Sequence, residues 1–424
     1  MEKIKNTARA TINRLGRFFG TDMMYIVKGG FWMNASYVFV SLVGLATSIL
    51  FARFLSKADY GMYQYVLSIA ALVSALTLTG MNSSVTRAVS RGFEGELVRT
   101  TKYQLWLGII PTTAAGITAI WYALHGQSGI ALALVFVALF LPPANALNTW
   151  GAYVSGKKDF PRGFYYGFFN TIISYSGVII LLIFTRNFIW VAFGNFFFGL
   201  VGNFIIYFWT IKVFRPSANV DKETVSYGNH LSLMNIPGAI AAQLDSILVF
   251  HFVGAAALAV YSFATLFPEK LAGGLKFVSG VALPRFSEKN EQSVNNFLKR
   301  QIWWILGSIG AIALAYALIA PYLFVWLFPN YMASVPYTQV YAFSFFSVAG
   351  GILQIALTSQ KKTKELYQLS FVIPAIKALL LLVFLFYFGV WGIIWAQIIT
   401  NFVSIIFVWK IIASKKSTEK ITNL

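Results

Sequence analysis

The chain contains no cysteine, only three histidines and few charged residues for its length. Charged residues make up 11% of its 424 residues, and only 14 residues are acidic. The absence of cysteine excludes disulfides, thiolate nucleophiles and sulfur-ligated metals. The scattered histidines, His125, His230 and His251, do not suggest a metal cage. The sequence therefore indicates neither a cofactor nor a resident metal.

Apolar residues dominate what is present. Hydrophobic residues make up 58% of the chain, and its mean hydropathy is +0.69, which no soluble core of this size requires. The sequence thus predicts an integral membrane protein. Runs of about 20 apolar residues have the length that a transmembrane helix needs. Twelve such runs are found, at 31–52, 62–82, 105–124, 129–148, 164–184, 188–211, 231–253, 258–283, 302–321, 337–358, 366–387 and 391–413.

The positions of the cations orient these runs. If the N-terminus is cytoplasmic, the loops on that side hold most of the 33 lysines and arginines, and the opposite loops hold Arg53, Lys57 and Arg186. This alternation follows the positive-inside rule, so we expect twelve helices with both termini in the cytoplasm. The net charge of +19 then reflects membrane topology, and it does not indicate nucleic-acid binding.

Five segments follow from this topology. Residues 1–28 carry apolar residues on one helical stripe and cations elsewhere, which predicts a basic amphipathic helix at the cytoplasmic surface, with an organelle transit peptide as the alternative. The remaining segments are a first lobe at 29–211, a cytoplasmic linker at 212–229, a second lobe at 230–413 and a cytoplasmic tail at 414–424.

The two lobes show signs of duplication. Matching residues recur at an offset of 198 (252−54, 261−63, 285−87), in the pairs Phe54 and Phe252, Tyr63 and Tyr261, and Arg87 and Arg285. Because six predicted spans separate the copies, both lobes have the same orientation in the membrane. This arrangement predicts two parallel six-helix lobes with a cavity between them, which is typical of a transporter that works by alternating access.

Charges within the predicted spans mark the candidate site. A charge at the centre of a membrane helix costs roughly 2.5 to 3.5 kcal/mol on insertion scales, so such residues usually face a water-filled cavity or each other. Four of them lie in the seventh and eighth spans and one in the eleventh, namely Asp245, Glu269, Lys270, Lys276 and Lys377. Pro268 and the pair Gly273 and Gly274 predict a break or kink in the eighth span, which would expose it to a cavity.

The charge balance suggests the cargo. Adding Arg53, Arg87 and Arg285 near the span ends gives a positive surplus, which favours an anionic cargo such as a phosphate or pyrophosphate. Asp245 and Glu269 would balance the field or titrate as coupling groups. The alternative is an internal network in which these two carboxylates neutralise the neighbouring lysines without touching substrate.

Several motifs resemble a known family. The stretch FARFLSKADYGMYQYVLSIAALVSALTLTGMNSSVTR from Phe51, the segment between Leu244 and Glu288, and LFPNYMAS from Leu327 resemble the polysaccharide-type (Wzx-like) flippases of the multidrug/oligosaccharidyl-lipid/polysaccharide (MOP) exporter superfamily. One difference is Ala259, which stands where the second copy of the Gly-x-Tyr pattern usually has glycine.

The resemblance implies a V-shaped pair of six-helix bundles, similar to the MATE transporters, in a bacterial cytoplasmic (inner) membrane. It further implies translocation of polyprenyl-diphosphate-linked oligosaccharides to the outer leaflet for O-antigen (lipopolysaccharide), capsule or exopolysaccharide synthesis, with Lys270, Lys276 and Lys377 receiving diphosphate or acidic sugars. Candidate partners are membrane lipids, a coupling proton or sodium ion, and a polysaccharide polymerase or chain-length regulator.

Three other functions compete with this one. A cation-coupled multidrug exporter of the same superfamily would need acidic residues for its cargo, but the first six predicted spans contain no Asp or Glu. A membrane polysaccharide polymerase needs a long outer loop, and the predicted outer loops are short. Nucleotide-driven transport is disfavoured because the sequence has no Gly-x-x-x-x-Gly-Lys-Ser/Thr loop. We therefore expect a transporter and not an enzyme.

Overall fold

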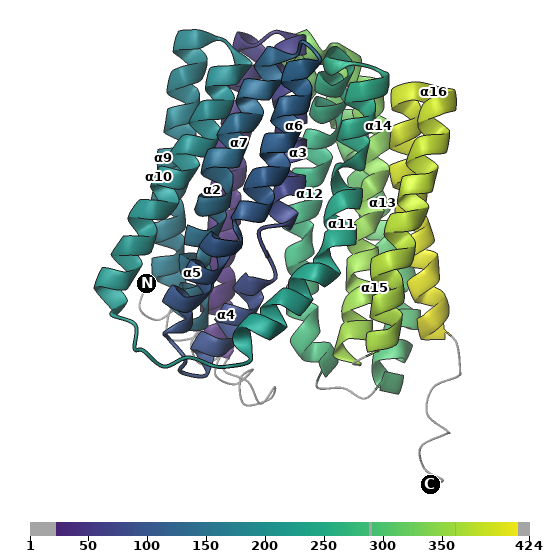
Figure 1. Cartoon of the computed structure of the whole chain (residues 1–424). Coiled ribbons are helices and arrows are strands. Elements are labelled where there is room, and N and C mark those ends of the chain that lie inside the picture. Colours follow the sequence, from purple (N-terminus) through teal and green to yellow (C-terminus); the bar gives the residue numbers. More distant parts are fainter. Residues whose placement is uncertain (1–22, 288–290, 361, 414–424) are drawn as a thin grey trace, which may run out of the picture.

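The computed structural model describes residues 23–287, 291–360 and 362–413, and every regular element in these ranges is a helix (Figure 1). The prediction of an all-α protein is confirmed. The tail at 414–424 and most of the predicted surface helix at 1–28 lie outside the described residues. In chain order the elements are α2 (Met23–Phe54), α3 (Lys57–Ala75), α4 (Met81–Ser90), α5 (Glu96–Leu107), α6 (Ile109–Leu124), α7 (Ser128–Leu147), α8 (Thr149–Gly156), α9 (Phe160–Thr185), α10 (Phe188–Phe214), α11 (Thr224–Phe252), α12 (Ala255–Ser287), α13 (Glu291–Leu327), η1 (Pro329–Ser334), α14 (Val335–Tyr341), η2 (Ala342–Phe346), α15 (Ser347–Ser359) and α16 (Thr363–Ala413).

Nine helical stretches among the described residues are long and apolar enough to cross a membrane. The predicted apolar runs fall on helices, but some are divided or joined. The run at 62–82 contains the break between α3 and α4, whereas the last two runs form the single element α16. Within α16 the chain turns back at Gly389, whose φ of 56° is sterically easy for glycine. The count of twelve spans therefore stays a prediction.

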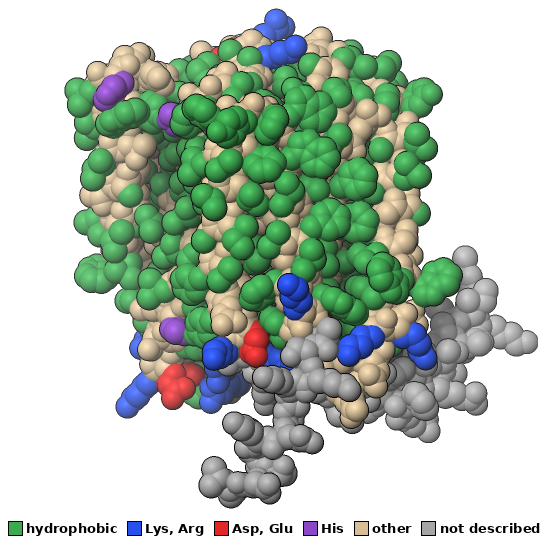
Figure 2. Space-filling view, turned by 90° about the vertical axis from the view of Figure 1, so that its right-hand side faces the viewer, with side chains coloured by type: hydrophobic (Ala, Val, Ile, Leu, Met, Phe, Trp, Pro, Cys, Tyr) green, Lys and Arg blue, Asp and Glu red, His purple; other side chains and the backbone are tan. Residues whose placement is uncertain are grey.

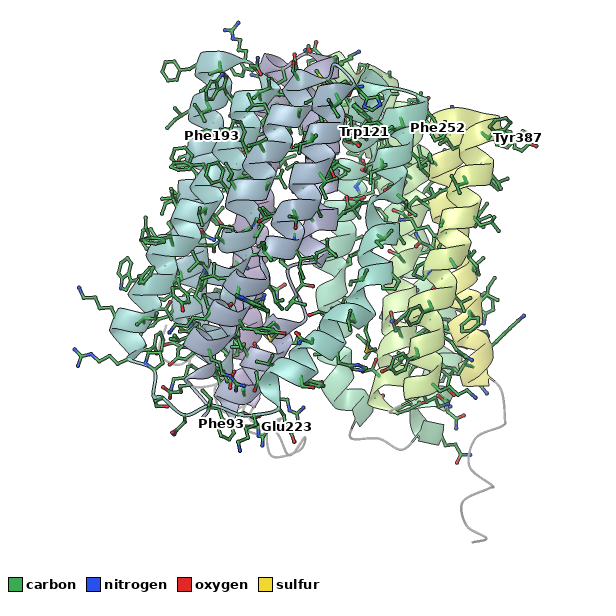
Figure 3. All side chains as sticks on the ribbon, in the orientation of Figure 1. Phe93, Trp121, Phe193, Glu223, Phe252 and Tyr387 are labelled. Carbon is green, nitrogen blue, oxygen red and sulfur yellow. The ribbon has the colours of Figure 1, made fainter. Side chains whose placement is uncertain are left out.

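The helices form two lobes, with α2–α10 on the left of Figure 1 and α11–α16 on the right. At the upper end, marked by Trp121 and Phe252 in Figure 3, one apolar core contains buried residues of both lobes. Toward the lower end, marked by Phe93 and Glu223, the described residues form two further cores, each built from the buried residues of a single lobe. The lobes are thus joined at the upper end and diverge below it, as the resemblance implied.

The upper end is sealed by contacts between α3 and α12. The ring of Tyr60 stacks on that of Phe263, with centroids 4.7 Å apart. At Gly61 the backbones approach so closely that an added Cβ atom would lie 1.8 Å from the carbonyl oxygen of Ala255. Backbone cannot move aside as a flexible side chain can, so only glycine permits this approach.

The boundaries of the first helices repeat at the offset found in the sequence. The helix α2 ends at Phe54 and α3 begins at Lys57, while α11 ends at Phe252 and α12 begins at Ala255 (252−54 and 255−57 are both 198). In the first copy, the hydroxyl of Ser56 caps α3 by accepting a bond from a backbone N–H in the first turn. The corner that connects the first two helices therefore falls at the same position in both lobes, although its backbone differs, because Gly254 has a φ of 110° where Ser56 has −64°.

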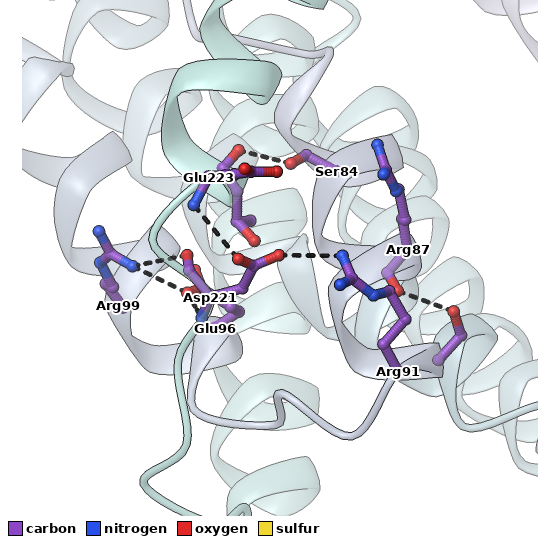
Figure 4. A network of polar contacts seen from close by, with 9 residues as sticks. Ser84, Arg87, Arg91, Glu96, Arg99, Asp221 and Glu223 are labelled. Atoms are coloured by element: carbon purple, nitrogen blue, oxygen red, sulfur yellow. Dashed lines mark hydrogen bonds and ion pairs between the residues drawn. The ribbon is translucent and has the colours of Figure 1, made fainter.

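The linker between the lobes is bound to the first lobe (Figure 4). The buried carboxylate of Glu96 accepts a 2.8 Å bond from the backbone N–H of Asp221 and a 2.9 Å bond from Arg99. Arg99 also donates to the carbonyl of Asp221 at 3.0 Å, and the backbone N–H of Gly95 donates to the carbonyl of Asn219 at 2.9 Å. The linker therefore follows the surface of α5 and is not a free tether.

The first turns of α11 also contact the first lobe. The hydroxyl of Ser84 on α4 donates to the carbonyl of Thr224, and the hydroxyl of Ser232 accepts a 3.1 Å bond from the backbone N–H of Gly80. The first lobe therefore contacts α11 as far as Ser232, although the sequence predicts that the second lobe begins at residue 230. The predicted boundary at 212–229 remains a prediction, because the start of α11 belongs by its contacts to both lobes.

An ion pair at the lower end leads to a prediction about pH. The Glu94 carboxylate lies 2.5 Å from the Lys157 ammonium, and this hydrogen bond holds the pKa of Glu94 below its ordinary value. A depressed carboxyl pKa adds stability above the ordinary pKa, and this stability is lost as the pH falls through the depressed value. We expect Lys157→Met to lower the free energy of unfolding by about 1 kcal/mol or less near neutral pH, and by much less in acid.

Thermal unfolding of the solubilised protein at neutral pH and at about pH 3 measures this difference. The control is Lys102→Met, which removes an exposed lysine from α5 and should leave the unfolding temperature unchanged at both pH values. An equal destabilisation by Lys157→Met at both pH values would show that the lysine stem contributes by packing and not by charge.

Candidate functional site

A cavity of about 580 Å³ lies between the two lobes. Its walls come from α2, α3 and α9 of the first lobe and from α11 and α12 of the second. The volume falls within the range of about 300–1,000 Å³ that is usual for small-molecule sites. The lining residues are Tyr37, Val40, Ser41, Tyr60, Gln64, Leu67, Ser68, Ala71, Tyr175, Ala242, Gln243, Asp245, Ser246, Tyr261, Ser262, Thr265, Leu266, Glu269 and Lys270.

Asp245 of α11 is the buried carboxylate of this wall, with 6% of its surface exposed. One carboxylate oxygen, Oδ2, accepts a 2.5 Å bond from the Tyr261 hydroxyl and a 2.6 Å bond from the Gln397 amide of α16. The other oxygen, Oδ1, is buried without a hydrogen-bond partner among the described residues. A buried oxygen of this kind is costly unless something binds it, so Asp245 has the properties of an acceptor for a proton or a small cation.

Glu269 of α12 is the second carboxylate of the wall. Its side chain is exposed, whereas that of Asp245 is buried. Its Oε1 accepts a long bond of 3.4 Å from the Tyr341 hydroxyl of α14. The cavity therefore has one carboxylate that is buried and held from two sides and one that is exposed.

Lys270 of α12 is half-buried and reaches across the cavity to the first lobe. A Cβ atom added to Gly44 of α2 would lie 3.1 Å from its Nζ and 3.5 Å from the hydroxyl of Tyr175 on α9. The backbone carbonyl of Lys270 accepts a 2.7 Å bond from the hydroxyl of Tyr37 on α2. Residue 270 thus joins the two lobes through both its side chain and its backbone.

The helix that carries these residues is not broken. The predicted break at Pro268 or at Gly273 and Gly274 does not occur, because α12 runs continuously from Ala255 to Ser287, and a kink at these residues stays a prediction. The glycine serves a different purpose: a Cβ atom on Gly273 would lie 2.1 Å from the Tyr37 hydroxyl. Gly273 therefore makes room for a side chain of the opposite lobe, which a sequence pattern cannot distinguish from a helix break.

The other predicted site residues are not on the described wall of the cavity. Arg53 is exposed at the upper end of α2, and Arg87 is exposed at the lower end, with its guanidinium 5.0 Å from the centre of the Tyr227 ring. Lys377 is half-buried on α16 and is not among the lining residues. The side chains of Lys276 and Arg285 lie outside the described residues.

The described wall therefore brings together three of the eight predicted residues, Asp245, Glu269 and Lys270. These are two carboxylates and one ammonium, whereas the sequence predicted a positive surplus. That expectation treated Arg53, Arg87 and Arg285 as cavity residues, and in the structure Arg53 and Arg87 are exposed at opposite ends of the bundle.

Sequence reasoning missed residues that close the upper end. The motif LFPNYMAS forms the end of α13 and the short helix η1, and its Asn330 donates a 3.1 Å bond to the carbonyl of Ala52 in the other lobe. Tyr331 is fully buried, with its ring 4.0 Å from that of Phe263 and 6.3 Å from that of Tyr60. A polar Asn-Tyr pair directly after a long apolar run is the signal that could have marked this contact.

Comparison with known families gives one match. A family model described as "Polysaccharide biosynthesis protein" matches residues 26–290, which is more than half of the chain. No curated protein matches the chain.

Solved structures of MOP superfamily transporters share the fold. An inward-facing multidrug resistance MATE family transporter of the MOP superfamily is similar with a TM-score of 0.66 at 15% identity, covering 90% of this chain and 96% of its own. The lipid II flippase MurJ, in an inward closed conformation, is similar with a TM-score of 0.67 at 14% identity. The match covers 90% of this chain and 87% of the MurJ chain. A MOP superfamily transporter from Pyrococcus furiosus is similar with a TM-score of 0.58 at 17% identity. This match covers 93% of this chain and 96% of the Pyrococcus chain. The predicted MOP fold is confirmed, and identities this low show the fold alone.

Proposed function

The chain belongs to the polysaccharide biosynthesis protein family, and from this membership we propose that it is a flippase for lipid-linked glycans. It would move polyprenyl-diphosphate-linked oligosaccharides between membrane leaflets for the synthesis of a surface polysaccharide. The observation that carries the proposal is the polar, charged cavity enclosed by both lobes of a membrane protein. Its fold is shared with a protein described as a lipid II flippase.

Alternating access follows from how the lobes meet. The shared core and the Tyr60–Phe263 stack close the upper end, while the lower cores are separate. If the lobes rotate about the cavity, the upper contacts open as the lower ends approach each other. A group bound between the lobes then becomes accessible from the opposite side of the membrane. Charged side chains are tolerated at this depth because they face the cavity and not lipid.

We place the lower end in the cytoplasm and the protein in a bacterial cytoplasmic membrane. Figure 2 shows more lysines and arginines at the lower end of the molecule than at the upper end, as the positive-inside rule requires. The cavity would then load from the side on which polyprenyl-linked sugars are made. A single cysteine introduced at Ser128, at the upper end, should react with an impermeant maleimide added outside intact cells, and protection there would reverse the orientation.

Translocation of a labelled polyprenyl-diphosphate oligosaccharide in proteoliposomes tests the function. We expect the intact protein to translocate it and Lys270→Ala to lose about tenfold or more, because the variant removes the ammonium that reaches between the lobes. The matched control is Lys102→Ala, which removes an exposed lysine far from the cavity wall. If the intact protein does not translocate this substrate, the proposed function is wrong. Equal activity of both variants would exclude a substrate role for Lys270.

A coupling ion would bind at Asp245. Its Oδ1 is buried without a hydrogen-bond partner among the described residues, and Asp245 lines a cavity with further hydroxyl and amide groups, which suits a proton or sodium ion. Charging the carboxylate in one state of the cycle and neutralising it in another would link ion movement to lobe movement.

An exporter of organic cations is the second candidate, because the described wall holds two carboxylates and one ammonium. A shared fold with a multidrug resistance transporter is consistent with it. The same proteoliposomes distinguish the candidates when they are loaded with an organic cation dye. Dye transport without translocation of the lipid-linked oligosaccharide would replace the flippase by the exporter.

A further inference from the structure

One contact between the lobes at the upper end is polar and contains a histidine. The ring of Tyr65 on α3 stacks on that of Phe250 on α11, with centroids 3.9 Å apart. The Tyr65 hydroxyl forms a hydrogen bond with the hydroxyl of Tyr122 on α6, which lies 3.2 Å from Nε2 of His251 on α11. Tyr65 and Tyr122 are buried, whereas His251 is exposed. The contact therefore joins two buried hydroxyls of the first lobe to a titratable ring of the second lobe.

Packing between the lobes does not by itself require these hydroxyls. Phe263 of the second lobe is the counterpart of Tyr65 at the offset of 198 (263−65), and its ring stacks on Tyr60 of the first lobe. Each lobe thus places an aromatic ring from the same position of the repeat against the other lobe, but phenylalanine has no hydroxyl. The hydrogen bonds of Tyr65, Tyr122 and His251 are therefore an addition to the packing that both copies share.

The geometry at His251 determines where the hydrogens lie when its ring is neutral. Nδ1 is 3.0 Å from the carbonyl oxygen of Ile247, and because a carbonyl only accepts, Nδ1 carries the hydrogen. Nε2 of the neutral ring is then an acceptor, so Tyr122 donates to Nε2 and Tyr65 donates to Tyr122. The two hydroxyl hydrogens occupy the two bonds, and both are satisfied.

Protonation of His251 adds one hydrogen too many. Histidine changes its charge between about pH 5 and 8, and the added proton makes Nε2 a donor. Three hydrogens then share two bonds, so one of them has no acceptor; if the charged ring turns to water instead, the hydrogen of Tyr122 loses its acceptor. Both tyrosines are buried where the lobes touch, so an unpaired donor is costly there. Separation of the lobes would bring water to it and remove this cost.

The other titratable groups near the upper end have different partners. His125 on α6 bonds to a carbonyl of its own helix, the Lys57 ammonium lies over an aromatic ring of η1, and the Asp59 carboxylate accepts from the hydroxyl that caps α3. In α12 the first titratable side chain is Tyr261, which donates to the buried carboxylate of the cavity. In α16, Tyr387 is exposed at the opposite edge of the bundle (Figure 3). Within this contact, His251 is thus the group that changes charge near neutral pH.

On these grounds we propose that Tyr65, Tyr122 and His251 form a pH-sensitive latch at the upper end. The latch holds the lobes together when His251 is neutral and releases them when His251 is protonated. The inference rests on alternating access and goes beyond the proposed function, because it concerns the side to which the cavity opens and not the cargo. With the upper end on the outer side of the membrane, an acidic exterior favours the outward-open state.

Distances between two spin labels test the latch without any cargo. Since the chain has no cysteine of its own, Ser128→Cys in the first lobe and Ala333→Cys in the second place one label on each lobe at exposed positions of the upper end. Double electron–electron resonance of the full-length protein in proteoliposomes, at about pH 8 and about pH 5.5, gives the populations with close and with distant labels. We expect the ratio of open to closed molecules to rise about tenfold in acid, which corresponds to about 1.4 kcal/mol.

Three variants assign this change to the latch. His251→Gln keeps an acceptor for Tyr122 but cannot gain a proton, so it should stay closed at both pH values. Tyr122→Phe removes the link between Tyr65 and His251, so its opening should not depend on pH, and it provides a second test if the glutamine variant folds poorly. The matched control is His125→Gln, which removes the other histidine of the upper end and should keep the tenfold change.

No change with pH in the otherwise intact protein overturns the proposal, and so does a change of the same size in His251→Gln or in Tyr122→Phe. Translocation of the lipid-linked oligosaccharide in the same preparations reports on the proposed function separately. The expected change in label distance needs no substrate, so a protein that opens in acid but does not translocate this substrate would retain the latch and lose the flippase function.

Discussion

Replacement of Gly61 by valine is expected to reduce translocation by about tenfold or more and to hold the upper end of the molecule open. The first atom of any side chain at this position would lie 1.8 Å from the carbonyl oxygen of Ala255. Overpacking typically costs about 1–3 kcal/mol, and about 1.4 kcal/mol shifts an equilibrium tenfold. Since the strain exists only where the lobes touch, the variant should disfavour the state that is closed at the upper end.

Two measurements separate this effect from simple loss of folding. Translocation in proteoliposomes reports the complete cycle, and labelling of a cysteine introduced at Ser262 on the cavity wall reports access from the upper end. The matched control is Gly116→Val in α6, another helical glycine, where an added Cβ atom would meet no atom within 4 Å. Unchanged translocation and unchanged labelling in Gly61→Val would show that the α3–α12 contact is not a gate.

Neutralisation of Asp245 is expected to remove the dependence of translocation on the coupling ion and to slow it by about tenfold or more. In Asp245→Asn the amide oxygen can still accept from Tyr261 and Gln397, so the packing is retained while the charge is lost. In Asp245→Ala both donors lose their acceptor, and each unsatisfied group costs about 1–3 kcal/mol. The alanine variant should therefore be unstable, whereas the asparagine variant should be folded but uncoupled.

Translocation at several sodium concentrations and pH values, together with thermal unfolding, distinguishes the two variants. Asp159→Asn is the control, because its carboxylate pairs with Arg162 at the exposed lower surface. If Asp245→Asn retains the full ion dependence, Asp245 is a structural residue and the coupling site lies elsewhere.

The fold was largely predictable because the membrane constrains it. In lipid every backbone polar group must bond within its own helix, so apolar runs of sufficient length become helices wherever they occur. The offset between copies and the charge of the loops then determine the arrangement. The positions at which chain segments break or join, such as the gap between α3 and α4, depend on packing and were not predictable.

The site was predictable in part. Asp245, Glu269 and Lys270 could be found because charges in membrane spans are costly and need a polar surrounding. The sequence does not show which face of a helix lines the cavity. Lipid and the protein core are similarly apolar, so the faces of a membrane helix do not differ in hydrophobicity. The contribution of Tyr37 was not predictable for the same reason, since its bond to the backbone of Lys270 joins residues 233 positions apart.

The attachment of the linker has a consequence for how far the lobes can separate. Its hydrogen bonds to α5, and those of the first turns of α11 to α4, leave no loose chain between the lobes. Any change in the angle between the lobes must therefore be taken up by bending or rotating α11 beyond Ser232, where Pro237 removes one helical hydrogen bond. A single helix would then set both the axis and the limit of the movement, and lengthening the linker by inserted residues would not widen the opening.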